Sequence, residues 1–320
     1  MKKIDVENLV KEMRAGNVRA LSRLMTLVET KPESAAGIMK AAHSSHKVSR
    51  RIGISGPPGA GKSTLVSNLI DSAVRDGQRV GALCIDPTSP LTGGAILGDR
   101  VRLSGSFDSR SVFIRSVASG ESLGGLAEAT RLHTFLLESF GFDLVLIETV
   151  GLGQVGYDIR NIAETLILIL VPESGDTVQI LKSGIIELAD IVVVNKSDRD
   201  GADEIAASLH ITFSDPKSGW TIPVIKAVAR NDVGTEEIRE AARAHLEYLE
   251  SSGEIARFRD PGASLMDAIE KEISRRVRNG LIDGAPAAAA IAKAVSDGER
   301  DPFSSAAEIA DIIFGGMRHE

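Results

Sequence analysis

The fold is decided by a short stretch that reads Ile52-Gly53-Ile54-Ser55-Gly56-Pro57-Pro58-Gly59-Ala60-Gly61-Lys62-Ser63-Thr64. It begins as a short apolar strand, and residues 64–75 continue it with the apolar spacing of an amphipathic helix. Between the two, residues 56–63 fit the pattern G-x-x-x-x-G-K-[ST] completely. A strand, a glycine-rich loop and a helix in this order predict a phosphate-binding loop, or P-loop.

The residue types of this loop explain the chemistry expected of it. Its glycines let backbone N–H groups turn inward around a β-phosphate, and the helix that follows directs its positive N-terminus there. Lys62 would reach the β- and γ-phosphates as a catalytic residue, and the Ser63 hydroxyl would bind magnesium. The alternative, a glycine-rich turn without a ligand, is disfavoured by the flanking strand and helix. The predicted phosphate-binding residues are Gly56, Pro57, Pro58, Gly59, Ala60, Gly61, Lys62, Ser63 and Thr64.

A second motif lies about 130 residues further on. The apolar run 191–194 leads into Asn195-Lys196-Ser197-Asp198, and the carboxyl ends of such strands are where α/β proteins bind ligands. The Asp198 carboxylate can accept hydrogen bonds from N1–H and the exocyclic amine of guanine, a pair of donors that adenine lacks. Lys196 would pack its stem over the base. A tetrapeptide that only caps a strand is the alternative, but together the two motifs favour GTP over ATP. Ala229 is a further predicted nucleotide-binding residue.

Acidic residues at strand ends are candidates for a magnesium site. The run 144–147 ends in Glu148-Thr149-Val150-Gly151, where the carboxylate can hold a magnesium-bound water and the Gly151 N–H can sense a γ-phosphate. Most regulatory GTPases have aspartate at this point, so glutamate suggests GTPases that work as metallochaperones or cofactor-loading helpers. Asp86 and Asp99 flank the glycine-containing stretch 87–98, and either could instead be a simple turn former.

Two residues are candidates for the hydrolysis step. Gln154 could orient the attacking water, and Lys182 could reach the γ-phosphate once the segment 175–184 closes. A surface amide and a solvated helix lysine are the respective alternatives. No arginine can be named from the sequence as a finger acting in cis, so a partner protein is expected to complete the site.

The pattern of apolar residues predicts an α/β domain between two helical regions. Helices are expected over 4–46, with a break at Gly16–Asn17, and again after about residue 233. Strands and helices alternate in between, which indicates a doubly wound, mostly parallel sheet. The expected strands are Arg51–Ser55, Arg79–Ile85, Ser111–Ser116, Asp143–Thr149, Thr165–Val171, Asp190–Asn195 and Thr221–Val228. The expected later helices are Thr235–Glu250, Ser264–Arg278, Ala285–Ser296 and Ser304–Phe314.

Composition excludes several other classes of protein. The formal net charge of −7 argues against a general nucleic-acid or acidic-membrane binder. A single cysteine, Cys84, cannot form an internal disulfide, and no apolar run approaches the roughly 20 residues of a spanning helix. A cytoplasmic protein with no nucleic-acid or membrane partner is therefore expected. His43 and His46 could bind a metal at helical spacing, but a solvated helix end is the favoured interpretation.

Together these residues resemble the MeaB/ArgK family, GTPase chaperones of adenosylcobalamin-dependent acyl-CoA mutases such as methylmalonyl-CoA mutase. The combination of Asp86-Pro87-Thr88-Ser89-Pro90 with Glu148-Thr149-Val150-Gly151-Leu152-Gly153-Gln154 is the most specific part of the resemblance. The other matching segments are Ala20–Glu29, Arg51–Thr64, Cys84–Arg102, Ser122–Ala127, Ala189–Asp198 and Tyr248–Glu254.

The resemblance implies a fold, a metal site and partners. It implies a P-loop GTPase domain at 49–252, a helical extension at 1–48 and a helical dimerisation region at 253–320. It implies that Ser63, Asp86, Asp99 and Glu148 surround Mg²⁺, and that residues 87–99, 151–158 and 173–182 are switch segments. It also implies a homodimer whose slow hydrolysis of GTP to GDP is stimulated by the mutase, and which gates cobalamin delivery and protects or rescues that enzyme. No cobalamin site of the chain's own is expected, because the pattern D-x-H-x-x-G is absent.

Two departures from the family pattern leave the client mutase open. The chain has Pro172-Glu173-Ser174-Gly175-Asp176 where the family usually has glycine after the proline, and Val155-Gly156-Tyr157-Asp158 where Ser-Glu is common. A mutase for isobutyryl- or 2-hydroxyisobutyryl-CoA is an alternative client. Alternative functions are a P-loop kinase, a nickel-insertion GTPase, which would need Cys- or His-based metal sites, and a non-enzymatic cobalamin-binding module.

Overall fold

The computed structural model describes residues 5–86, 111–118, 125–149, 159–172, 185–214, 219–259, 261–277 and 284–314. The chain divides into two compact units, Met1–Phe258 and Arg259–Glu320. The domain boundaries expected from the sequence, at 48/49 and 252/253, stay predictions.

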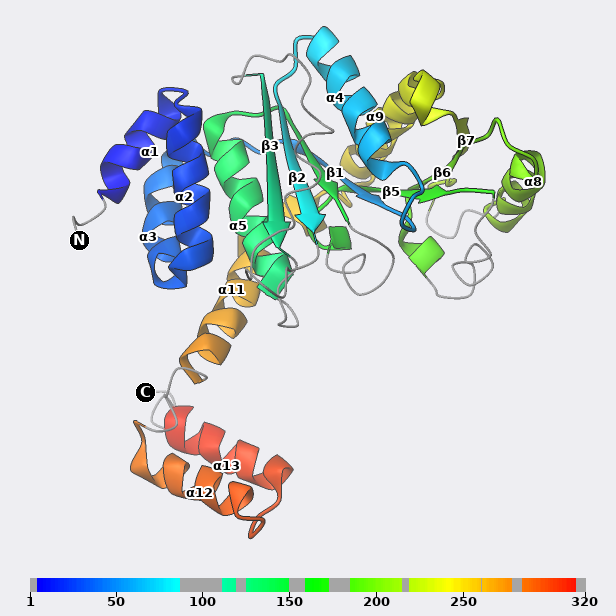
Figure 1. Cartoon of the computed structure of the whole chain (residues 1–320). Coiled ribbons are helices and arrows are strands. Elements are labelled where there is room, and N and C mark those ends of the chain that lie inside the picture. The colour runs from blue at the N-terminus through cyan, green and yellow to red at the C-terminus, as the bar shows by residue number, and fades with distance from the viewer. Residues whose placement is uncertain are drawn as a thin grey trace. The chain divides into compact units, whose positions relative to one another are not determined.

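Seven parallel strands form the sheet of the larger unit (Figure 1), in the order β3-β2-β4-β1-β5-β6-β7. The central strand β1 pairs with β4 through Ile52 and Leu146, and with β5 through Ile52 and Thr165. The order of the strands reverses at β1, so a ligand site is expected beyond its carboxyl end. The predicted parallel α/β fold is confirmed. The strands are β1 (Arg50–Ser55), β2 (Val80–Asp86), β3 (Val112–Ala118), β4 (Leu144–Glu148), β5 (Thr165–Leu170), β6 (Ile191–Asn195) and β7 (Val224–Ala227).

Helices cover both faces of this sheet, because its strands are apolar on both sides. In β5, Leu166, Leu168 and Leu170 belong to cores with α5 and α8, whereas Ile167 and Ile169 belong to the core under α4 and α9. The four helices are α4 (Lys62–Arg75), α5 (Gly125–Phe140), α8 (Ala202–Thr212) and α9 (Thr235–Ser252). Short 3₁₀ helices lie at Pro32–Ser34, His43–Ser45, Ile185–Leu188 and Ala229–Asn231.

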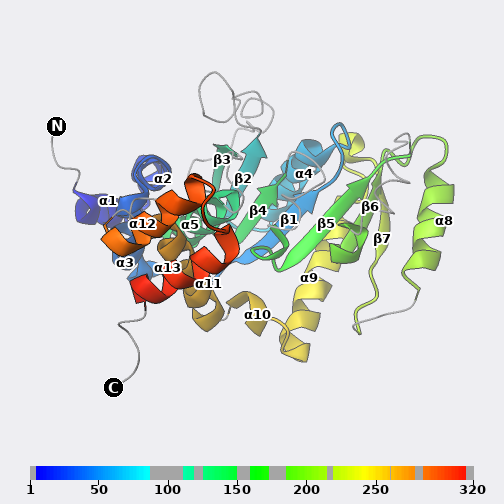
Figure 2. The ribbon, with the colours of Figure 1, turned by 90° about the horizontal axis from the view of Figure 1, so that it is seen from below.

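Three N-terminal helices pack outside α5 (Figures 1 and 2) and share its core. The predicted break between the first two is present: the Asn17 side chain accepts hydrogen bonds from the backbone N–H groups of Arg19 and Ala20 and so begins the second helix. The helices are α1 (Val6–Arg14), α2 (Val18–Thr30) and α3 (Ala35–Ala42).

Glu138 of α5 forms hydrogen bonds with the segment that joins the N-terminal helices to β1. Its carboxylate, 1% exposed, accepts hydrogen bonds from His46 Nε2 (2.7 Å), the backbone N–H of Ser49 (3.1 Å) and Arg51 Nε (2.7 Å). Burial raises the pKa of Glu138, but the His46 hydrogen bond and the Arg51 charge outweigh burial and leave it below its ordinary value. The sequence favoured a solvated helix end over a metal site for His43 and His46, and the structure instead pairs His46 with the buried Glu138 carboxylate.

The smaller unit is helical, as the sequence predicts. Helices α12 and α13 pack together around Ala288 and Ile291. A four-residue helix, α10, lies where the chain passes between the units. The helices are α10 (Ala256–Arg259), α11 (Pro261–Arg276), α12 (Pro286–Ser296) and α13 (Pro302–Phe314). Within the described ranges of both units, the structure has no helix with the length and apolar character needed to cross a membrane.

Candidate nucleotide-binding site

The P-loop connects β1 to α4 through three glycines whose positions exclude larger residues. Gly61 precedes α4 with a φ of 93°, and a Cβ there would lie 2.3 Å from the Asn195 side-chain nitrogen. A Cβ on Gly56 would lie 2.4 Å from the Ile169 carbonyl oxygen, and Gly59 has a φ of 73°. The loop therefore needs glycine for close backbone approach as well as for backbone conformation. Helix α4 then begins at Lys62, with Ser63 and Thr64 in its first turn.

The Lys62 ammonium is buried in this loop. Its Nζ donates hydrogen bonds to the carbonyl oxygens of Gly56 (2.9 Å) and Pro57 (3.0 Å). The cation is thus held at the centre of the loop. Phosphate oxygens would be the stronger, charged acceptors for the same group.

Ser63 and Glu148 meet at the carboxyl edge of the sheet. The Ser63 hydroxyl donates to Glu148 Oε1 over 2.7 Å, and Thr149, the next residue, donates from Oγ1 to Ser55 Oγ over 3.1 Å. The pairing of β4 with β1 brings these residues together from positions 85 apart in the sequence. Hydroxyl and carboxylate oxygens are the ligand types that Mg²⁺ prefers, so this donor set fits the ion.

Asn195, the last residue of β6, connects the P-loop to the base motif. Its Nδ2 donates to the Ala60 carbonyl over 2.7 Å, and its Oδ1 accepts from the Ala229 N–H over 3.0 Å. The buried Asn195 amide therefore links the base motif that follows β6 to the P-loop at Ala60 and to the loop after β7 at Ala229, which we call the base loop. Lys196 follows in the left-handed backbone region, at φ 57°, which turns the chain sharply after the strand.

Asp198 follows the strand end at the surface of the candidate nucleotide site, and its side chain is 40% exposed. It forms an ion pair with Arg230, whose Nη2 lies 3.3 Å from Asp198 Oδ2. Arg230 follows Ala229 in the 3₁₀ helix Ala229–Asn231. Sequence reasoning missed this arginine, and the only available signal was its place next to Ala229. The guanidinium is 77% exposed, so the pair is screened by solvent.

Several predicted site residues lie outside the described part of the chain. They are Asp99, Gly151, Gln154 and Lys182, together with the switch segments 87–99, 151–158 and 173–182. The backbone of Asp86 ends β2, next to β4 in the sheet, but its side chain is not described. The structure thus brings together Gly56–Thr64, Glu148, Asn195 and Ala229, with Lys196 and Asp198 beyond them. In the described ranges no group of three or more His, Cys, Asp or Glu residues is arranged to hold a metal ion.

Comparison with known proteins identifies the family. Residues 21–281 match the model of the methylmalonyl Co-A mutase-associated GTPase MeaB. The chain belongs to the MeaB family. The matched region contains the P-loop, Glu148 and the base motif.

Relatives of this MeaB-family chain cover nearly its whole length. It is 41% identical over 323 residues to a Pyrococcus abyssi protein assigned as a GTPase, covering 97% of this chain and 98% of that protein. It is 31% identical over 282 residues to the GTPase ArgK of Escherichia coli, covering 85% of each. These matches confirm the expected MeaB/ArgK resemblance.

A solved structure shares the fold. The crystal structure of a LAO/AO transport system kinase superimposes with a TM-score of 0.68 at 23% identity, covering 98% of this MeaB-family chain and 99% of that one. At this identity the likeness concerns the fold alone, and it confirms the predicted P-loop fold.

Proposed function

We propose that this chain hydrolyses GTP with magnesium. The observation that carries this proposal is the Asn195 amide, which joins the P-loop at Ala60 to the base loop at Ala229. One nucleotide can then contact the loop through its phosphates and Asp198 through its guanine. Lys62 would stabilise charge on the β- and γ-phosphates, and Ser63 and Glu148, with Asp86 and Asp99, would hold the ion. The ion would supply electrostatic stabilisation of the triphosphate.

Hydrolysis is tested by phosphate release from GTP and ATP. Purified protein should release phosphate from GTP in preference to ATP, without a phosphorylated protein or small-molecule product. Lys62→Ala should abolish release, whereas Lys40→Ala, at an exposed lysine of α3, should leave it unchanged. A phosphorylated product would favour the kinase alternative, and wild-type hydrolysis by Lys62→Ala would refute the P-loop mechanism.

We propose further that hydrolysis controls adenosylcobalamin loading, protection or reactivation of an acyl-CoA mutase. The family description, a methylmalonyl Co-A mutase-associated GTPase, supports this role. Purified acyl-CoA mutases encoded in the source genome should be added singly to the GTPase assay. One of them should stimulate hydrolysis and be retained by the immobilised chain. Association only with a hydrogenase or urease precursor would instead favour the nickel-insertion alternative.

A homodimer through the C-terminal helices belongs to the same proposal. Helix α11 exposes four apolar side chains at helical spacing, Leu265, Met266, Ile269 and Ile273, which a second copy would bury. Light scattering should give the mass of a dimer for wild type and of a monomer for Ile269→Lys. Glu270→Gln, an exposed neighbour on α11, is the control and should remain dimeric.

A further inference from the structure

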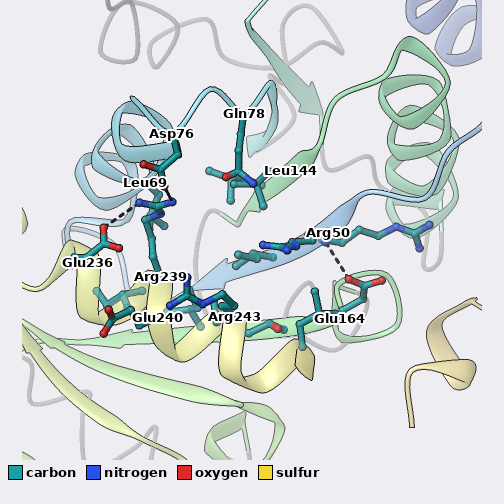
Figure 3. Close-up of a pocket in the computed structure, with 18 residues that line it drawn as sticks. Arg50, Leu69, Asp76, Gln78, Leu144, Glu164, Glu236, Arg239, Glu240 and Arg243 are labelled. Carbon is teal, nitrogen blue, oxygen red and sulfur yellow. Dashed lines mark hydrogen bonds and ion pairs between the residues drawn. The ribbon is translucent and has the colours of Figure 1, made fainter. Parts of the chain in front are cut away.

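A cavity lies at the opposite edge of the sheet from the P-loop. It has a volume of about 280 Å³ and opens over the amino ends of β1, β4 and β5, between the end of α4 and helix α9 (Figure 3). Because all strands are parallel, Ser55, Glu148 and Asn195 end at the other edge. The cavity therefore shares no lining residue with the nucleotide site described above.

The two helices that wall the cavity are joined on the side nearer the P-loop. Asn68 of α4 donates to Thr235 Oγ1, in the first turn of α9, over 3.5 Å. One turn on, Arg239 of α9 donates to Ser72 Oγ over 2.6 Å and also bonds Asp76. Beyond Arg239, α9 presents the small Ala242 to the cavity. The floor is apolar and is formed by Ile52, Leu69, Leu144, Leu146, Ile167 and Leu246.

Charged side chains surround this apolar floor, and some of them are already paired. Arg239 contacts both Asp76 and Glu236, the latter over 2.9 Å, so those three charges are committed to one another (Figure 3). Buried Glu164 accepts the backbone N–H of Arg51 over 3.3 Å, and the Arg51 guanidinium binds Glu138 on the other face of the sheet.

Among the described residues, Arg50 and Arg243 are the rim cations without a side-chain hydrogen bond or ion pair of their own, and the Arg243 charge contributes to the lowered pKa of Asp76 only as the weakest of several effects. Arg50 and Ile52 lie on the same face of β1, because side chains alternate along a strand, and both line the cavity. Arg243 lies one turn after Arg239 on α9. Across the ranges that the structure describes, neither guanidinium donates a hydrogen bond or forms an ion pair. Glu240, three residues before Arg243, also lines the rim but is not within ion-pair distance of it.

We propose that this cavity binds a small amphipathic carboxylate, with its hydrocarbon part on the apolar floor and its carboxylate between Arg50 and Arg243. Guanidinium groups bind carboxylates through two parallel hydrogen bonds, which suits two unpaired arginines beside an apolar surface. Four arginines and four carboxylates line the cavity, so its formal charge is balanced and it favours a monoanion over a multiply charged phosphate. Its volume lies just below the ~300 Å³ lower end of drug-sized sites, so the ligand has few carbon atoms.

Hexanoate is the probe for the test, with hexanol and hexylamine as matched molecules that lack the negative charge. Binding to the full-length chain is measured by saturation-transfer NMR and calorimetry. Hexanoate should bind at least about tenfold more tightly than either control molecule, the effect of losing one charge-assisted hydrogen-bond pair. Absent binding at millimolar hexanoate, or equal binding of hexanol, would overturn the proposal.

Two variants locate the bound carboxylate. Arg243→Gln should weaken hexanoate binding about tenfold, whereas Arg19→Gln, at an exposed arginine of α2, should leave it unchanged. Ala242→Leu should block the cavity and abolish binding, and its folding is checked by circular dichroism. GDP affinity should be the same in Arg243→Gln and wild type, so this result stands apart from the GTPase proposal. Hexanoate affinity unchanged in both cavity variants would place the ligand elsewhere and refute the assignment.

Discussion

The Ser63 hydroxyl and Glu148 Oε1 are joined by a 2.7 Å hydrogen bond between the first turn of α4 and the last residue of β4. The Ser63 Oγ and Glu148 Oε1 atoms are therefore adjacent, at the point where the P-loop lies next to the end of β4. Oxygen ligands held in this way need little rearrangement to accept a hard divalent cation.

Glu148→Gln keeps the size of the side chain but removes its charge. Magnesium should then bind about 10- to 100-fold more weakly, as when an outer-shell carboxylate of a metal site is removed. Phosphate release from GTP, titrated against Mg²⁺, should show the higher requirement. Glu187→Gln, at an exposed acid outside the site, is the control. An unchanged magnesium dependence would remove Glu148 from the metal site.

Asp198→Asn should shift the preference of the chain from GTP toward xanthosine triphosphate. The amide can donate to the 2-oxo group of xanthine but no longer accepts both guanine donors, so GTP affinity should fall at least about tenfold. Competition binding with the two nucleotides measures the change. Asp200→Asn, two residues further on and exposed, is the matched control. GTP affinity equal to wild type would contradict the guanine assignment.

Arg230→Ala should weaken GTP binding slightly, because Arg230 holds the Asp198 carboxylate from a solvent-exposed position. Exposed ion pairs contribute at most ~1 kcal/mol, which corresponds to a change of about fivefold or less. Lys226→Ala breaks a comparable exposed pair, Lys226–Asp203 at 2.8 Å, outside the site and is expected to have no effect on GTP. A loss as large as that of Asp198→Asn would mean that Arg230 itself contacts the nucleotide.

His245 should make the stability of the larger unit depend on pH. Burial, with a further contribution from the Arg160 charge, lowers the pKa of His245 to about 4, while its ring contacts Thr165 at 2.9 Å. The unfolded chain takes up the proton near 6.5, so stability from neutral His245 is complete above pH 6.5 and is lost as the pH falls to 4. The loss should amount to ~3 kcal/mol.

Urea unfolding of wild type and His245→Gln between pH 4 and 7 measures this effect. The difference in their free energies of unfolding should grow as the pH rises. The pKa of the neighbouring Asp190 is raised by burial to about 6 against the opposing effect of Arg160, so Asp190 contributes with the opposite sign. Because Asp190 Oδ1 lies 3.3 Å from His245 Nε2, the comparison is repeated in an Asp190→Asn background. His210→Gln, at an exposed histidine of α8, is the control. A difference that does not vary with pH would mean that His245 is not held neutral.

The central strands were predictable because several contain a continuous apolar run, such as Leu144-Val145-Leu146-Ile147 in β4. Asp143–Thr149 was expected where β4 spans Leu144–Glu148, whereas Thr221–Val228 proved longer than β7, Val224–Ala227. Helix starts were less accurate. The sequence placed α11 and α13 at Ser264 and Ser304, but both begin at prolines, Pro261 and Pro302, as the fixed φ of proline favours in a first helical turn.

The site was predictable where a motif fixes local geometry and unpredictable where distant segments meet. The P-loop and the base motif are each a few consecutive residues that directly follow a strand, β1 and β6, so their sequence alone predicts their place in the fold. The contact of Asp198 with Arg230 depends on the paired strands β6 and β7, and the cavity beside Arg50 depends on how α4 and α9 pack against each other over the sheet. Neither arrangement has a periodicity or spacing that a single sequence displays.

The amide of Asn195 has a consequence for ligand shape. Because it fixes Ala60 and Ala229 through one rigid group, the protein would set the span between the triphosphate and the base of the nucleotide that we propose it binds. A guanine compound whose ribose is replaced by a longer or shorter connector would bind the P-loop through its phosphates or Asp198 through its base, but not both. With GTP bound as proposed, the protein would therefore select the sugar by its length, although none of the residues assigned to the site needs to touch it.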